Sequence, residues 1–209
     1  VIRDINLLSR DLYEDLKASK EFDFHYERKG LLMAYQTEKA GEAEWKVGKR
    51  LIKAGLNAEM LSKEEIKKRE PNANLDVKGG VFYDCDGHTT PSDFMPEMVK
   101  HLRELGVEIL AKEEVKDIEI SNELISKIIT DKREVVADEV VLAAGSWSPL
   151  LSKKTGLKLL IQAGKGYRIN LARETGVTIP TILLEAKVAV TPMNGFTRFA
   201  GTMEIGGIN

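Results

Sequence analysis

Three short stretches of the sequence hold side chains that could do chemistry. The first is the loop from Asp84 to His88, where two aspartates, a cysteine and a histidine stand close together. These residue types bind metal ions, but a zinc site needs three or four ligands fixed by a second element. The other histidines, His25 and His101, fall on a predicted strand and a predicted helix with no paired spacing. We therefore interpret the loop as a solvated turn and expect no metal site.

The second stretch reads "GSWS" and offers the hydroxyl groups of Ser146 and Ser148. A serine hydrolase of the nucleophile-elbow type presents its serine in a G-x-S-x-G turn with a histidine further along the chain. This stretch lacks that turn, and no histidine follows it, which argues against a serine hydrolase. Trp147 could stack on a base or could cap the core, and both interpretations stay open.

The third group is basic and lies near the end of the sequence: Arg168, Arg173 and Arg198. A guanidinium that faces a cleft can hold a carboxylate by two parallel hydrogen bonds, whereas a surface arginine is usually solvated. Only Arg198, on a predicted hairpin strand beside Gly201, is a candidate ligand for a substrate. The residues alone favour the solvated interpretation even there.

Hydrophobic periodicity predicts the elements that position these groups in the first half of the chain. Apolar residues recur at helical spacing over 2–16, and residues 22–37 read as two short strands about Gly30. A helix is predicted over 38–54. A second helix begins with the capping box of Ser62 and Glu65.

The second half begins with a helix that starts at Thr90 and Pro91. Residues 107–110 form the next predicted strand, 115–136 a three-stranded meander, and 139–145 an apolar strand. One long, bent strand is predicted over 157–171. A hairpin follows around Asn194-Gly195, a strong turn signal.

An apolar strand that follows a meander and ends in Ala143, Ala144 and Gly145 is typical of the second half of two-part flavin-binding folds. Small residues there let the backbone approach a cofactor, although they also permit helix packing in any α/β protein. The chain contains no G-x-G-x-x-G and no G-x-x-x-x-G-K-[ST] sequence. A loop that binds pyrophosphate through backbone N–H groups is therefore not encoded in it.

Composition narrows the class of partner. The 209 residues carry 31 basic and 33 acidic side chains, so the formal charge of -2 gives no broad field that would attract nucleic acid or an anionic membrane. No apolar stretch approaches the ~20 residues that span a bilayer. The single cysteine excludes an internal disulfide framework and fits a reducing compartment, so we expect a cytoplasmic protein. The opening residues have the pattern of a helix cut from inside a longer protein.

Four stretches, taken in order, resemble one family: "GGVFYDCDGHTTPSDF", "VVLAAGSWSPLL", "KGYRINL" and "AKVAVTPMNGFTRFAGTMEIGG". They are similar to the FAD-dependent D-amino-acid dehydrogenases of the glycine oxidase and sarcosine oxidase superfamily, and together they span nearly the whole chain. The family's pyrophosphate loop would lie outside these 209 residues. The resemblance therefore implies an inactive internal fragment that does not retain FAD by itself.

The resemblance implies an α+β or α/β fold with two parts. Residues 1–85 and 157–209 would form a substrate-binding domain with a mixed, largely antiparallel sheet, interrupted by residues 86–156. That middle part would belong to a Rossmann-like FAD domain that contains the meander. His88 matches the histidine of the family's D-G-H loop, with no chemical role assigned to it.

The resemblance also assigns residues to sites. Those expected near FAD are Val115, Ala143, Ala144, Gly145, Trp147, Lys165 and Gly166, and those expected near the substrate are Tyr167, Arg198, Gly201 and Met203. No catalytic residue and no metal ligand is implied. Ala163 and Gly164 stand where the family often has Pro and Val, so the local strand geometry is expected to differ from the family's.

The activity implied is oxidation of a D-amino acid to a 2-oxo acid and ammonia, by hydride transfer to FAD. Electrons would leave through membrane quinone, so peripheral contact of the full protein with the inner face of a membrane is expected, and a homodimer stays open. The alternatives are an amine oxidase of the glycine or sarcosine oxidase type, and a binding module that never binds flavin.

Overall fold

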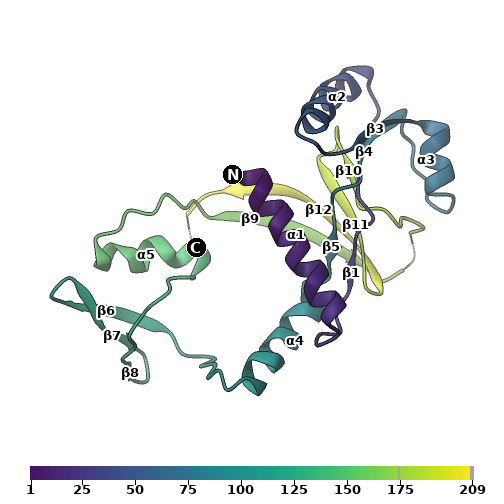
Figure 1. The fold of residues 1–209 in the computed structure, drawn as a ribbon. Helices are drawn as coiled ribbons and strands as arrows, with labels where there is room; N and C mark the ends of the chain where they lie inside the picture. Colours follow the sequence, from purple (N-terminus) through teal and green to yellow (C-terminus); the bar gives the residue numbers. More distant parts are fainter. Residues whose placement is uncertain (174, 208–209) are drawn as a thin grey trace. The chain divides into compact units, whose positions relative to one another are not determined.

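The computed structural model describes residues 1–173 and 175–207, which belong to two compact units (Figure 1). The first unit comprises Val1–Val107 and Gly166–Thr202, and the second comprises Glu108–Lys165 and Met203–Asn209. Each unit is described by itself below. Among the described residues, no helix combines the length and the apolar character needed to cross a membrane.

A seven-stranded sheet is the main element of the first unit, with the order β3-β4-β2-β10-β11-β12-β9. The strands are β2 (Leu31–Tyr35), β3 (Ala58–Ser62), β4 (Gly79–Tyr83), β9 (Gly164–Leu171), β10 (Thr181–Leu183), β11 (Val188–Met193) and β12 (Phe196–Ile205). Strand β10 pairs parallel with β2. Four further pairs are antiparallel: β2 with β4, β3 with β4, β10 with β11, and β11 with β12. The predicted mixed, largely antiparallel sheet is confirmed.

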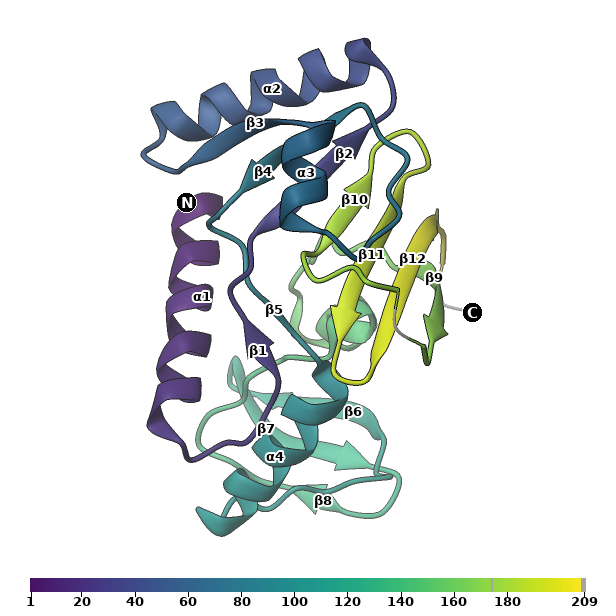
Figure 2. The same ribbon diagram turned by 90° about the vertical axis from the view of Figure 1, so that its right-hand side faces the viewer.

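The core of this unit lies where the sheet meets α2 (Glu38–Lys53) and α3 (Lys63–Arg69), which pack beside β3 and β4 (Figure 2). Its centre is a cluster of buried apolar side chains: Leu32, Ala34, Leu61, Ile66 and Val77. Both helices begin as their sequences predict. The Ser62 hydroxyl accepts a hydrogen bond from the backbone of Glu65, whose carboxylate accepts one from the Ser62 N–H in return.

A second, two-stranded sheet pairs β1 (Tyr26–Glu27) antiparallel with β5 (His88–Thr89). It lies with α1 (Ile2–Ser19) and α4 (Pro91–Glu104) around a set of aromatic rings, of which Phe22 and Phe24 are almost fully buried. Thr90 is the N-cap of α4, as predicted, but its hydroxyl does not cap the helix. That hydroxyl contacts other parts of the unit, described below.

The second unit contains the predicted meander. Strands β6 (Val115–Ser121), β7 (Leu124–Thr130) and β8 (Glu134–Val135) pair antiparallel in sequence order. A short 3-10 turn, η1 (Gly145–Trp147), leads into α5 (Ser148–Ser152), and a second turn, η2 (Lys153–Thr155), follows.

Three predicted strands differ from the structure. Residues 107–110 and 139–144 form no strand, and the predicted long strand over 157–171 begins only at Gly164. A strand needs a neighbour that satisfies its backbone N–H and C=O groups, and the described residues provide none for these segments. Their apolar side chains are correspondingly open to solvent: Val141 is 89% exposed and Leu160 fully exposed.

Candidate functional site

Two neighbouring strands, β9 and β12, hold six of the residues predicted to lie near flavin or substrate. Strand β9 contains Lys165, Gly166 and Tyr167, and β12 contains Arg198, Gly201 and Met203. Lys165 and Met203 belong to the second unit, and the other four belong to the first.

Arg198 is the centre of a small polar cluster in the first unit. Its Nε donates a hydrogen bond of 3.2 Å to Oδ1 of Asn170 on β9. Its guanidinium carbon lies 5.6 Å from the centre of the Phe196 ring, within range of a cation–π contact. The side chain is half-buried and held on two sides, so the guanidinium is oriented before any ligand binds.

Arg168 joins this cluster because it lies two residues from Asn170 on β9, and strand alternation directs both side chains to one face. Burial lowers the pKa of Arg198 from its ordinary value, and the positive charge of Arg168 lowers it further. No acidic side chain of the described residues acts on Arg198 or forms an ion pair with either arginine. Two cations thus share one face of the sheet without a described counter-ion.

Tyr167 is not brought to this cluster. It is adjacent to Arg168 on β9, so alternation directs its side chain to the opposite face, where it is 43% exposed. The structure therefore brings Arg198 together with Arg168 and Asn170, which the sequence analysis did not assign, and separates it from Tyr167, which it did.

The two glycines predicted to lie near flavin or substrate, Gly166 and Gly201, have different surroundings. A Cβ on Gly201 would lie 3.1 Å from Cγ2 of Val188 and 3.2 Å from the carbonyl oxygen of Lys187, so the packing of β11 against β12 is sufficient reason for glycine there. A Cβ on Gly166 would meet no described atom within 4 Å. Gly166 thus leaves open space beside β9.

The second unit holds a pocket of about 370 Å³ beside η1. Its lining comprises Ser146, Trp147, Ala163, Gly164, Lys165, Glu204, Gly206 and Gly207. Two residues predicted to lie near flavin, Trp147 and Lys165, are therefore brought to one cavity, although they are eighteen positions apart. Trp147 leaves 59% of its surface exposed, which is available to stack on a planar group.

The other residues of this unit that were predicted to lie near FAD are not among those that line the pocket. Ala143 and Ala144 lie in the irregular segment before η1, where the Ala144 carbonyl accepts a hydrogen bond of 3.0 Å from the N–H of Trp147. Gly145 has a φ of 53° and open space at its Cβ position. Val115, at the start of β6, is 36% exposed and is not among the residues that line the pocket.

The segment with the unusual Ala163 and Gly164 forms a regular backbone contact. The Gly206 N–H donates to the Ala163 carbonyl at 3.3 Å. A Cβ on Gly164 would lie 3.3 Å from the sulfur of Met203, so the Met203 side chain covers this glycine. Met203 therefore packs on β9 close to the pocket and still leaves 71% of its surface exposed.

One group of side chains was missed by the sequence analysis. His25, Glu27 and His88 converge in the first unit, with potential ligand atoms all within 4.8 Å of one another. His25 and His88 have no paired spacing in the sequence, but β1 and β5 pair and place Glu27 opposite His88. The signal in the sequence was the alternating H-x-E of residues 25–27, which puts two such side chains on one face of a strand.

Comparison with known proteins places this fold. The family described as DAO, FAD dependent oxidoreductase, matches residues 2–209. The chain belongs to this family. FAD is the cofactor for which the family is named. The predicted resemblance to a family of flavoenzymes is confirmed.

Among curated relatives of this chain, the D-amino acid dehydrogenase of Helicobacter pylori is 32% identical over 200 residues, which are 95% of this chain and 47% of that protein. The D-amino acid dehydrogenase of Rhizobium rhizogenes is 28% identical over 205 residues and is covered to 49%. The chain thus spans about half the length of the curated relatives it matches.

Solved structures show the same fold. The glycine oxidase of Bacillus cereus superposes with a TM-score of 0.83 at 24% identity, over 99% of this chain and 57% of that one. The L-alpha-glycerophosphate oxidase of Mycoplasma pneumoniae, solved with FAD bound, gives a TM-score of 0.79 at 19% identity and is covered to 56%.

The residues of the second unit fit part of such a cofactor. The pocket beside η1 combines an exposed indole, the ammonium group of Lys165 and the backbone of Gly206 and Gly207, where a Cβ would meet no described atom within 4 Å. Its volume lies at the lower end of the range for small-molecule sites, which is below what a whole dinucleotide requires. These residues would therefore hold one portion of FAD, and the pyrophosphate loop is absent from the 209 residues.

Proposed function

We propose that this chain is part of an FAD-dependent dehydrogenase that oxidises D-amino acids to 2-oxo acids and ammonia. The observation that supports it most is the pairing of Arg168 with Arg198 on one face of the sheet, with no described acid to neutralise them. Two adjacent cations repel each other, and an anionic ligand removes that repulsion. The amino-acid carboxylate is the anion that the proposed reaction supplies.

Arg198 holds the substrate carboxylate through its two terminal nitrogens, because its Nε is already engaged by Asn170. Arg168 adds a second positive charge on the same side. The arginines thereby fix the α-carbon of the substrate, and this positioning reduces the entropy that must be lost when the substrate reacts. When bound, the flavin supplies the chemistry, since it accepts the hydride.

The division of the chain is part of the same proposal. Residues 1–85 and 157–209 form the substrate-binding domain, and residues 86–156 belong to the flavin domain. Trp147 and Lys165 contact FAD from the pocket beside η1. Ala143, Ala144, Gly145, Val115 and Gly166 lie near other portions of the cofactor. Gly201 and Met203 border the substrate site, whereas Tyr167 faces the other side of β9 from Arg168.

A glycine or sarcosine oxidase is the second candidate, and the superposition with the glycine oxidase of Bacillus cereus favours it. The two candidates differ in the electron acceptor. A dehydrogenase passes electrons to a membrane quinone, which requires peripheral membrane contact of the whole protein, whereas an oxidase passes them to O2. Hydrogen peroxide release with glycine as substrate, without any quinone, would favour the oxidase.

The proposal is tested with the full-length, flavin-loaded enzyme and a panel of D-amino acids. Arg198→Ala removes a charge-assisted contact to the carboxylate, and such contacts contribute about 1.5–3 kcal/mol, so we expect KM to rise about tenfold or more. The flavin content stays unchanged because Arg198 lies outside the pocket beside η1. Arg173→Ala is the matched control, since Arg173 is an exposed arginine of the same segment.

Kinetics that are unchanged in Arg198→Ala would remove this arginine from the substrate site. Equal effects of the two substitutions would indicate a general loss of positive charge. Absence of turnover with every D-amino acid, in an enzyme that oxidises glycine or sarcosine, would replace the dehydrogenase by the second candidate.

A further inference from the structure

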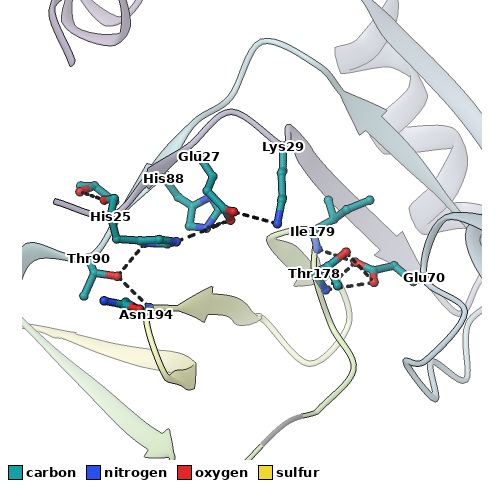
Figure 3. A network of polar contacts seen from close by, with 10 residues as sticks. His25, Glu27, Lys29, Glu70, His88, Thr90, Thr178, Ile179 and Asn194 are labelled. Atoms are coloured by element: carbon teal, nitrogen blue, oxygen red, sulfur yellow. Dashed lines mark hydrogen bonds and ion pairs between the residues drawn. The ribbon is translucent and has the colours of Figure 1, made fainter. Parts of the chain in front are cut away.

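The contact between β1 and β5 brings three potential metal ligands together on the first unit (Figure 3). His25 and Glu27 are two residues apart, so the extended backbone directs both side chains to one face. His88 is the cross-strand partner of Glu27 in the antiparallel register. A two-residue ladder is thus enough to make the three side chains converge.

The distances match those of a metal site. Nε2 of His25 lies 3.5 Å from Oε2 of Glu27, and Nε2 of His88 lies 3.6 Å from the same oxygen. In a tetrahedral zinc site with bonds of 2.0–2.2 Å, neighbouring ligand atoms are about 3.3–3.5 Å apart. Oε2 of Glu27 therefore already lies at about the required distance from both imidazoles, whereas the two imidazoles, whose ligand atoms lie within 4.8 Å of each other, would have to move closer to share one ion.

His88 gives an independent reason to expect a ligand. Its side chain is 9% exposed, and neither ring nitrogen makes a hydrogen bond with the described residues. A buried imidazole nitrogen without a partner can offer its electron pair to a metal ion, which would satisfy this polar group.

The surroundings orient the ring of His25. Its Nδ1 is 2.9 Å from the Thr90 hydroxyl, which is fully buried and also accepts the N–H of Asn194 at 3.0 Å. Metal-bound histidines usually direct the second nitrogen to such oxygen acceptors.

Glu27 has one oxygen left for an ion. Lys29 occupies Oε1 at 3.0 Å, whereas Oε2 faces the two imidazoles. A carboxylate oxygen placed in this way can neutralise part of the charge of a cation.

We propose that His25, Glu27 and His88 bind one divalent transition metal ion, of the type of Zn²⁺, and so fasten β1 to β5. Two imidazoles and one carboxylate are an accepted ligand set for such ions, with the fourth position taken by water. A cavity of about 710 Å³ reaches His88, and another of about 440 Å³ reaches His25. The site is separate from Arg198 and from the pocket beside η1.

The test is a titration of the chelator-treated chain with Zn²⁺ by calorimetry at pH 7, repeated with Co²⁺ and followed by visible absorption. We expect one equivalent to bind, with the absorption of a low-coordinate Co²⁺ site. Glu27→Gln and His88→Asn each lower the affinity by more than about tenfold, since even substitutions in the second shell have effects of 10–100-fold. His101→Asn is the matched control and leaves binding unchanged, because its ring lies near Glu21 and not in the cluster.

Glu27→Gln keeps the test decisive if His88→Asn disturbs folding, because Glu27 is one-third exposed and the amide is isosteric with the carboxylate. Circular dichroism verifies that each variant is folded. Lys29→Gln removes a competing cation and is expected to tighten Zn²⁺ binding several-fold. Absence of binding, or equal binding by the wild type and Glu27→Gln, would overturn the proposal.

Discussion

Glu70 is a buried carboxylate that joins two segments far apart in the sequence. It is 1% exposed and accepts hydrogen bonds from the backbone N–H groups of Thr178 and Ile179 and from the Thr178 hydroxyl (Figure 3). These donors belong to the segment that enters β10, which pairs with β2 at the centre of the sheet. The carboxylate therefore fixes the approach of β10 to the core.

Glu70→Gln is expected to lower the free energy of unfolding by about 1.5–3 kcal/mol, because the amide presents one acceptor oxygen to donors that now share two. Urea unfolding measures the loss. Glu64→Gln, an exposed position of α3, is the control and should change the stability little. A loss of equal size in both variants would mean that the charge of α3, rather than the buried contacts, is responsible.

Tyr83 gives the protein a dependence on alkaline pH. Its hydroxyl donates a hydrogen bond of 2.6 Å to Glu44, and its pKa is raised, first by burial and then by that carboxylate. A raised pKa means that the folded state favours the protonated phenol, so the stabilisation is complete below the ordinary pKa of 10.0 and is lost as the pH rises above it.

We expect Tyr83→Phe to lose less stability than the wild type between pH 8 and about pH 11, since Phe has no proton to release. Near pH 7 the variant should be less stable by about 1–3 kcal/mol, because Glu44 loses a hydrogen-bond donor. Denaturant unfolding of both proteins near pH 7, at pH 8 and at about pH 11 measures the difference in stability and its change with pH. Parallel losses in the two proteins would show that other groups, such as lysines, determine the alkaline behaviour.

Site residues could be predicted from the sequence where the residue type and its local pattern were sufficient evidence. Arg198 was a candidate from its type and its place in a hairpin, and it does lie in a polar cluster. Arg168 and His25 were missed because their relevance depends on which strand lies beside them and in which register. Neither is fixed by local pattern when the strands are short and far apart in the chain.

At the level of elements, the β6–β7 hairpin contains a mismatch between residue type and backbone. Ser121 pairs with Leu124, so Asn122 and Glu123 form a two-residue turn, with φ values of 51° and 66°. Such a turn suits Asn-Gly, because a side chain with a positive φ is strained. Asn122 tolerates this conformation, whereas Glu123 does not.

Glu123→Gly is expected to raise the stability of the hairpin by about 0.5–1 kcal/mol, because relief of strain exceeds the entropy lost by glycine. Amide hydrogen exchange of Ile120 and Ile125, which face each other near the turn, reports on this element alone. Ser121→Gly is the control and should speed exchange, since glycine weakens a strand. Faster exchange in Glu123→Gly would mean that the glutamate side chain stabilises the turn.

The predicted elements that the structure contains are those whose neighbouring strand is close in sequence or whose first residues include a recognisable helix cap. The meander, the hairpin at Asn194-Gly195 and the capping box of α3 are examples. Residues 107–110 and 139–145 have the apolar pattern of buried strands, but pattern alone cannot supply a neighbour. The described residues offer them none, so the segments stay irregular.

For the whole molecule, the arginine cluster belongs to one compact unit and the pocket beside η1 belongs to the other. The chain spans about half the length of its curated relatives. Amino-acid binding by the first unit should therefore be measurable in these 209 residues without bound flavin.

We expect the purified 209-residue chain to be colourless and to retain no FAD after reconstitution and gel filtration. The pocket of about 370 Å³ can hold only a portion of a dinucleotide, and no glycine-rich loop is present to bind the pyrophosphate at a helix N-terminus. Visible flavin absorbance in the protein peak measures retention, and the full-length enzyme treated in the same way is the control. Stoichiometric FAD in the short chain would mean that the residues around Trp147 and Lys165 bind the whole cofactor, so that the pyrophosphate is held without a glycine loop.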